Sequence, residues 1–164
     1  MGAHRRLVMG STRSPSMIVP RLLVALSLTL YVISLTQNTF CVSSGCDKWL
    51  GWGVLLNGWI EPAAIRQVGP FVALAWLANP CVGVTWVCAF TGNRFLAMIF
   101  GSAGFLFGIA FLLGRYVLVS ASGAGYRITG YAAGYWIWIA GLAVALGAAI
   151  GSRDRNGACG ERMN

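Results

Sequence analysis

Four hydrophobic segments divide the chain, and polar stretches separate them. The segments cover about residues 17–35, 68–90, 95–113 and 131–151. Each is long enough to cross roughly 30 Å of hydrocarbon as a helix that rises about 1.5 Å per residue. The pattern predicts an all-α fold: a polytopic membrane protein with four transmembrane helices in one domain over residues 22–151.

The connections between the segments differ in length. Residues 36–67 and 114–130 form two long loops on one side of the membrane, whereas residues 91–94 form a short turn on the other side. An even number of spans places both tails, residues 1–21 and 152–164, on the side of the short turn.

The first hydrophobic segment allows a second interpretation. A basic stretch ahead of a short apolar run is also typical of a secretory signal peptide. No small-x-small cleavage site follows the run, and Phe40 before Cys41 does not suit a lipoprotein signal. We therefore expect the first segment to be retained as a helix, and in both cases the loop that follows faces outward.

The first long loop contains an apolar stretch that is too short to span a membrane. It covers residues 49–60, WLGWGVLLNGWI, and carries three tryptophans. Indole rings favour the headgroup level, where one edge contacts hydrocarbon and the other contacts water. We expect an additional interfacial segment here, either a helix or a re-entrant turn. The predicted interfacial anchors of the whole chain are Trp49, Trp52, Trp59, Trp136 and Trp138.

Composition and charge support the membrane interpretation. Of the 164 residues, 57% are hydrophobic and 10% are charged, and the mean hydropathy is +0.71, whereas roughly a quarter of the residues of a soluble domain are charged. The net charge of +8 would suit a nucleic acid if the cations formed one face or stripe. They flank the apolar segments instead. We therefore expect the lipid bilayer, and no nucleic acid, as partner.

The distribution of Lys and Arg predicts the orientation. Eight of these residues lie on the side of the tails and the short turn: Arg5, Arg6, Arg13, Arg21, Arg94, Arg153, Arg155 and Arg162. Four lie on the side of the long loops: Lys48, Arg66, Arg115 and Arg127. Because cytoplasmic loops carry the excess of Lys and Arg, both termini are predicted to be cytoplasmic in a multi-pass protein of the inner (plasma) membrane.

The second segment contains Asn79 and Pro80 at its middle. Pro80 cannot donate to the carbonyl of Trp76, and it disfavours helical backbone at Asn79. We predict a kink or break in which the Asn79 amide donates to the freed carbonyl or to a neighbouring helix. The alternative is a ligand or ion site at the break, as in transporters with interrupted helices.

Glycines four residues apart in the third and fourth segments predict close helix packing. They are Gly104 and Gly108, and Gly147 and Gly151. Small residues at this spacing let two backbones approach, which supplies packing where lipid gives no hydrophobic driving force. We expect packing within the bundle, and association of two copies is the alternative.

The five cysteines divide between loop, membrane and tail. Cys41 and Cys46 lie in the outward loop, where an oxidising environment would allow a disulfide. Cys81 and Cys88 lie on one face of the second segment, where thiols usually pack as small apolar groups, and Cys159 lies in the tail. The thiol-oxidising quinone reductases of bacterial membranes resemble this chain in helix number. They carry a CxxC pair that this chain lacks, so a thiol-redox function is the least favoured alternative.

The chain offers few groups for catalysis. Away from the ends of the four segments, none contains Asp, Glu, Lys, Arg or His, whereas proton relays and charge-coupled pumps require such groups. The one histidine, His4, lies in the N-terminal tail, which argues against a His-based metal site or a Ser-His-Asp triad. There is no phosphate-binding loop or dinucleotide fingerprint. We predict no catalytic residue, no metal ligand and no cofactor.

Three aromatic motifs resemble a pattern of small uncharacterised bacterial inner-membrane proteins with four hydrophobic segments. The motifs are Gly51-Trp52 to Gly58-Trp59, Trp76-Leu77-Ala78-Asn79-Pro80 and Gly134-Tyr135-Trp136-Ile137-Trp138, within residues 50–151. The resemblance implies a four-helix membrane fold and no known activity.

Two functions fit these observations. The first is a non-enzymatic inner-membrane protein that acts through helix–helix contacts with another membrane protein or with itself. It would be an accessory subunit, or an immunity-type protein that shields the membrane from a toxin. The second is a small permease or channel component, in which Asn79, Thr85 and Ser102 line a path for an uncharged solute.

Overall fold

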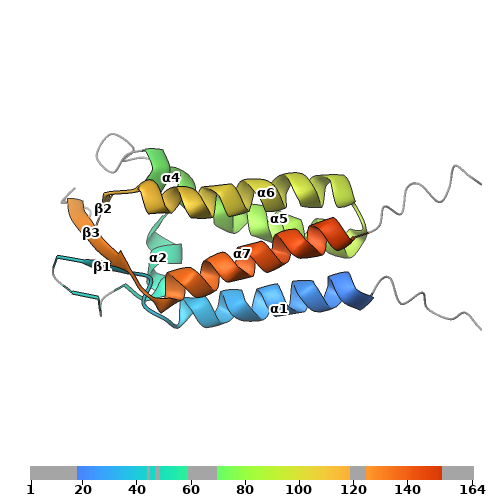
Figure 1. Ribbon diagram of the computed structural model, residues 1–164, viewed down its shortest axis with the longest axis horizontal. Coiled ribbons are helices and arrows are strands. Elements are labelled where there is room, and N and C mark those ends of the chain that lie inside the picture. Colours follow the sequence, from blue (N-terminus) through green and yellow to red (C-terminus); the bar gives the residue numbers. More distant parts are fainter. Residues whose placement is uncertain (1–17, 44, 47–48, 59–69, 119–124, 153–164) are drawn as a thin grey trace, which may run out of the picture.

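The part of the chain that the structure describes contains four helices long and apolar enough to cross a membrane. The computed structural model describes residues 18–43, 45–46, 49–58, 70–118 and 125–152. The spans are α1 (Ile18–Leu35), α4 (Pro70–Ala75) continued by α5 (Ala78–Thr91), α6 (Arg94–Ala110) continued by the short 3-10 helix η3 (Phe111–Leu113), and α7 (Ala133–Gly151). They run side by side along the long axis of the molecule (Figure 1).

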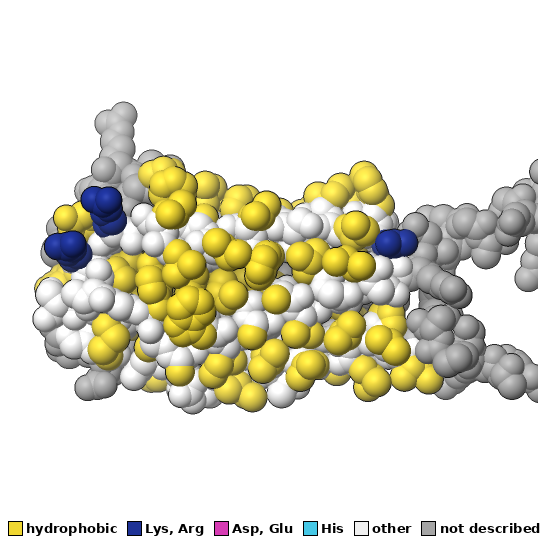
Figure 2. All heavy atoms as spheres, in the orientation of Figure 1, with side chains coloured by type: hydrophobic (Ala, Val, Ile, Leu, Met, Phe, Trp, Pro, Cys, Tyr) yellow, Lys and Arg dark blue, Asp and Glu magenta, His cyan; other side chains and the backbone are white. Residues whose placement is uncertain are grey.

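Large apolar side chains cover the outside of these helices. Leu22 on α1, Val87 on α5, Phe95 on α6 and Ile150 on α7 are all exposed. On the face drawn in Figure 2, hydrophobic side chains follow the whole length of the bundle, and Lys and Arg gather at its two ends. This is the surface expected of a protein whose solvent is hydrocarbon, since a soluble protein rarely leaves so large an apolar patch exposed.

The all-α prediction is wrong in one respect, because the two long loops contribute a small antiparallel sheet. Its strands are β1 (Phe40–Val42), β2 (Tyr116–Leu118) and β3 (Gly125–Tyr131), in the order β1-β3-β2. Phe40 pairs with Tyr131, and Tyr116 pairs with Arg127. Exposed and half-buried residues alternate along β3, which is the pattern of a strand with one face packed on the protein. The sheet closes one end of the bundle (Figure 1), which we call the sheet end.

Several boundaries differ from those predicted. α1 begins at Ile18, so Arg21 lies inside this helix and not in a tail. The fourth span begins at Ala133 because residues 125–131 form β3. In the first long loop, the predicted interfacial segment forms α2 (Gly51–Asn57), a helix of 7 residues.

A tight turn joins α5 to α6 at the other end of the bundle, which we call the turn end. Gly92 ends α5 with φ 81°, a left-handed conformation that glycine adopts without a steric cost. The next residue, Asn93, caps α6, and its side-chain oxygen accepts a hydrogen bond from the Leu96 N–H at 3.2 Å. Two adjacent residues thus stop one helix and start the next.

α7 is the centre of the bundle, because it packs against α1, α5 and α6. Its buried positions are mostly small: Gly134, Gly141, Ala145, Ala148 and Ala149. A Cβ added at Gly141 would lie 3.4 Å from the Ser27 carbonyl oxygen and 3.5 Å from the Tyr31 nitrogen. The backbones of α1 and α7 therefore approach closely at this point.

Candidate functional site: the break in the second span

The second apolar span is interrupted just ahead of Ala78 and Asn79. Trp76 and Leu77 separate α4 from α5 and belong to neither helix. The Asn79 N–H donates to the Trp76 carbonyl at 3.1 Å, three residues back instead of four. Pro80 therefore lies in the first turn of α5, where a missing N–H leaves fewer intrahelical bonds unmade.

The Asn79 side chain joins three elements at the break. Its Nδ2 donates to the Trp76 carbonyl at 3.1 Å, the contact expected from the sequence. Its Oδ1 accepts from the Tyr31 hydroxyl of α1 at 3.1 Å and from Trp138 Nε1 of α7 at 3.2 Å. Because an amide oxygen has two lone pairs, these two donors use its accepting capacity. Groups of the same chain fill the break.

The polar residues of the predicted solute path do not lie on one surface. Thr85 is fully buried, and its hydroxyl donates to the Cys81 carbonyl of the preceding turn at 2.8 Å. Ser102 is exposed on the outside of α6. Within one chain, Asn79, Thr85 and Ser102 therefore do not line a common path.

A second buried polar contact was not anticipated from the sequence. The Ser27 hydroxyl, fully buried on α1, donates to the Gly141 carbonyl of α7 at 2.7 Å and accepts from Trp86 Nε1 of α5 at 3.0 Å. The ring of Trp86 also meets that of Tyr31 edge-on, with centroids 5.4 Å apart. The available signal was a serine and a tryptophan within apolar segments, where each needs a hydrogen-bond partner.

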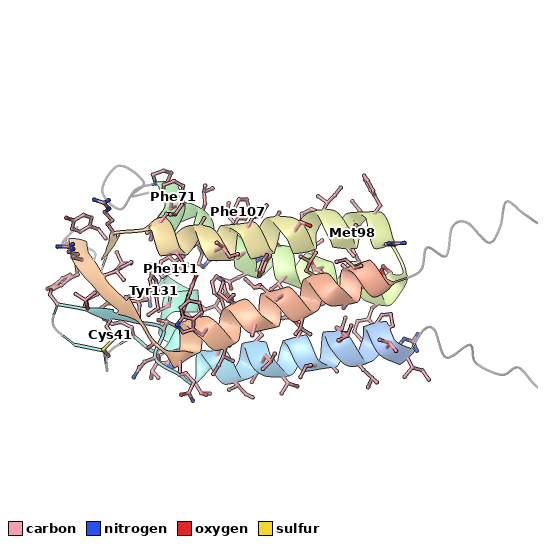
Figure 3. All side chains as sticks on the ribbon, viewed as in Figure 1. Cys41, Phe71, Met98, Phe107, Phe111 and Tyr131 are labelled. Carbon is pink, nitrogen blue, oxygen red and sulfur yellow. A yellow bond between two sulfur atoms is a disulfide. The ribbon has the colours of Figure 1, made fainter. Side chains whose placement is uncertain are left out.

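Aromatic rings from several elements form a cluster at the sheet end. Phe111 of η3 lies between the rings of Phe40, Tyr131 and Tyr135, with centroids 5.7 to 5.9 Å away. The Tyr131 hydroxyl donates to the Phe111 carbonyl at 3.0 Å, and the two labelled rings lie together in Figure 3. Burial raises the pKa of Tyr131 above its ordinary value of 10.0. The Tyr135 hydroxyl donates to the Gly108 carbonyl at 3.1 Å.

The predicted tryptophan anchors occupy different environments. Trp52 on α2 and Trp136 on α7 are each 54% exposed. Trp59 lies outside the described residues. Trp49 stacks on Phe40 with centroids 5.3 Å apart, and Trp138 donates to the Asn79 side chain at the break. Their rings find partners inside the protein.

Cys41 and Cys46 form a disulfide with an S–S distance of 2.07 Å. The bond closes a short turn at the end of β1, and reciprocal main-chain hydrogen bonds between Val42 and Gly45 (2.9 and 3.1 Å) hold the same turn. The other described cysteines are free thiols, half-buried at Cys81 and buried at Cys88. Cys159 lies outside the described residues.

Two of the four predicted packing glycines face other helices at close range. A Cβ at Gly104 would lie 3.2 Å from the Cys81 Cβ, and one at Gly108 would lie 2.7 Å from Leu142 Cδ1. Gly151 would meet one proline atom at 3.9 Å, and Gly147 would meet nothing within 4 Å. Packing inside the bundle therefore involves the glycines of α6, whereas Gly147 leaves an open position on α7.

The described part of the chain contains no group of three or more His, Cys, Asp and Glu residues that could hold a metal ion. Compared with protein-family models, with curated proteins and with solved structures, the chain matches none. The resemblance of its aromatic motifs to small bacterial membrane proteins stays a prediction.

Proposed function

We propose that the protein is a non-enzymatic, multi-pass protein of the bacterial inner membrane that acts through helix–helix contacts with another membrane protein. An accessory subunit and an immunity-type protein are the two forms this function could take. In this proposal, both termini are cytoplasmic and the sheet end faces outward. The excess of Lys and Arg in the tails and the short turn supports this orientation.

The observation that carries the proposal is the occupied helix break. Asn79 is the only Asn or Gln in the four described spans, and its oxygen already accepts from Tyr31 and Trp138 while its nitrogen donates to Trp76. A solute would have to displace these bonds. What the bundle offers to a partner is its apolar exterior, because helices in lipid associate by packing small and apolar surfaces.

One face of α7 suits such a contact. Ala140 and Ala143 are exposed there, and a Cβ at Gly147 would meet nothing within 4 Å. A partner helix could approach the α7 backbone closely at these three positions. Self-association through this face is included in the proposal.

The permease function is the alternative, and a path for an uncharged solute would then require several copies around a common axis. Its supporting observation is the interruption at Trp76 and Leu77, the feature by which many transporters form their sites. Ser102, exposed on α6, could line such a path only between copies.

Purification from the native membrane in mild detergent tests the proposal. We expect a complex whose mass, measured by light scattering, exceeds that of one chain and whose partner is identified by mass spectrometry. Gly147→Leu should release the partner. Gly83→Leu on α5 is the matched control, because a Cβ at Gly83 also meets nothing within 4 Å. A homo-oligomer that releases an uncharged solute from liposomes would overturn the proposal in favour of the permease.

A further inference from the structure

The helix α2 begins directly against the end of α1. The Gly51 N–H donates to the Gln37 carbonyl at 2.9 Å. A Cβ at Gly51 would lie 2.5 Å from the Ser34 carbonyl oxygen and 2.8 Å from the Leu35 Cα, and backbone atoms of a helix cannot move aside cheaply. Only glycine fits at this contact, so the first turn of α2 has a fixed position at the end of the first span.

The other end of α2 is held by the residue at the break of the second span. Trp76 Nε1 donates to the Leu55 carbonyl at 3.0 Å. The Trp76 ring also lies so close to Gly58 that a Cβ there would overlap with the indole. The carbonyl of Trp76 accepts a hydrogen bond from the Asn79 side-chain amide. One residue therefore contacts α2 with its side chain and closes the break with its backbone.

The remaining face of α2 is apolar and largely exposed. Trp52 is 54% exposed and Leu56 is 62% exposed. They are four residues apart, so they lie on the same side of the helix. α2 lies at the sheet end, where the spans terminate (Figure 1). A tryptophan and a leucine at this level suit the boundary between headgroups and acyl chains.

We propose that α2 lies at the membrane interface and responds to bilayer thickness. Its Trp52–Leu56 face inserts into the headgroup boundary of the bilayer, and Trp76 couples the depth of α2 in the bilayer to the angle between α4 and α5. We place the movement at the break, because Trp76 and Leu77 belong to neither helix and α4, which precedes them, has only 6 residues. In a thinner bilayer, the headgroup boundary lies closer to the middle of the spans. α2 moves with this boundary, and its movement opens the break.

This inference rests on the membrane location of the four spans and is independent of any protein partner. Its test therefore uses the purified full-length protein in nanodiscs. Hydrogen–deuterium exchange is measured for peptides that cover residues 74–81, in discs of dioleoyl- and of dimyristoyl-phosphatidylcholine. We expect exchange at the break to be faster in the thinner dimyristoyl discs, by roughly two- to tenfold if one hydrogen bond of ordinary strength is weakened.

Two variants distinguish the proposed coupling between α2 and the break from a general loss of stability. Trp52→Ser combined with Leu56→Ser removes exposed side chains only, and it should abolish the dependence of exchange at the break on lipid. Trp76→Phe keeps an aromatic ring and removes the hydrogen bond to Leu55. It should also abolish the lipid dependence, and combining all three substitutions should cause no further change. The matched control is Trp136→Ser combined with Leu113→Ser, whose side chains are 54% and 61% exposed. It should keep the lipid dependence.

Three results would overturn the proposal. The first is equal exchange of the wild-type break in both lipids. The second is a lipid dependence that survives the change of Trp52 and Leu56. The third is the loss of this dependence in the control as well. If Trp76→Phe does not fold, the Trp52 and Leu56 variant still decides the matter, because its side chains do not pack in the core.

Discussion

The two ends of the bundle reach tight packing by different means. At the sheet end, the buried cluster contains large side chains from helices and strands, among them Phe40, Phe111 and Tyr135. At the turn end, the buried cluster consists of Cys88, Ala97 and Ala149. Aromatic rings need partners at their edges, and a cluster of such rings can be rearranged. Small side chains bring backbones together and leave no room for a larger residue.

This difference assigns different tasks to the two ends. The sheet end also carries the disulfide, α2 and the half-buried Tyr131. The turn end has a two-residue connection at Gly92 and Asn93 and serves to hold α5, α6 and α7 together. We expect the sheet end to change its shape and the turn end to stay rigid.

Asn79→Leu tests the contact that lies between the two ends. The change leaves the Tyr31 hydroxyl, Trp138 Nε1 and the Trp76 carbonyl without their partner. We expect a loss of about 2–4 kcal/mol in the free energy of unfolding, measured by dodecyl sulfate titration in mixed micelles. Asn57→Leu is the control, because among the described residues this exposed amide bonds to the Gly53 carbonyl of its own helix. Unchanged stability of Asn79→Leu together with a lost phenotype would assign Asn79 a functional role.

Ala97→Leu tests the rigidity of the turn end. Ala97 is fully buried between α5 and α7, so the larger side chain forces the helices apart and should cost about 2 kcal/mol. Ala143→Leu on the exposed face of α7 should change stability by less than about 0.5 kcal/mol. The same titration measures both. Equal losses of stability in the two variants would mean that the turn end accommodates a larger side chain as easily as the exposed surface does.

Replacing Cys41 and Cys46 by serine tests the disulfide of the sheet end. The bond joins residues separated by 5 positions, and a loop this short should contribute about 2 kcal/mol through the unfolded state. A reductant should lower the stability of the wild-type protein by the same amount and leave the double variant unchanged. A larger loss would show that the bond also holds the sheet in place, beyond the two hydrogen bonds between Val42 and Gly45.

Tyr131 gives the smallest expected effect, and it appears only at high pH. Because burial raises its pKa above 10.0, folded Tyr131 keeps a proton that the unfolded chain loses. Its stabilising contribution is complete below pH 10.0 and decreases as the pH rises above that value. The difference in melting temperature between the wild type and Tyr131→Phe should therefore narrow above this pH. A constant difference would mean that Tyr131 ionises as it does in the unfolded chain.

The four apolar helices could be predicted from the sequence because their signal is local. Twenty or so apolar residues in a row need no knowledge of the rest of the chain. The break at Asn79-Pro80 is local as well, since the missing N–H of proline acts within one turn. The partners of Asn79 could not be predicted, because Tyr31 and Trp138 lie 48 and 59 residues away.

The sheet was missed for a related reason. β3 has the alternating pattern of a strand, yet β1 and β2 have 3 residues each, too few to distinguish from a loop. Their pairing joins the two long loops across the bundle. Gly147 illustrates the same limit: its spacing to Gly151 is that of a packing motif, and only the rotation of α7 shows that it faces outward.

The hydrogen bond from Ser27 to Gly141 has a consequence for biosynthesis, because its two residues are 114 positions apart. α1 leaves the ribosome before the other three described spans, and α7, against which it packs, leaves after them. At roughly 5–20 residues per second, α1 would wait on the order of 6–23 seconds for α7. During this time, Trp86 of α5 is the described side chain that can already donate a hydrogen bond to Ser27. A chain that stalls before α7 therefore holds a first span without its main partner, which is the state in which an insertion factor or a membrane protease would meet it.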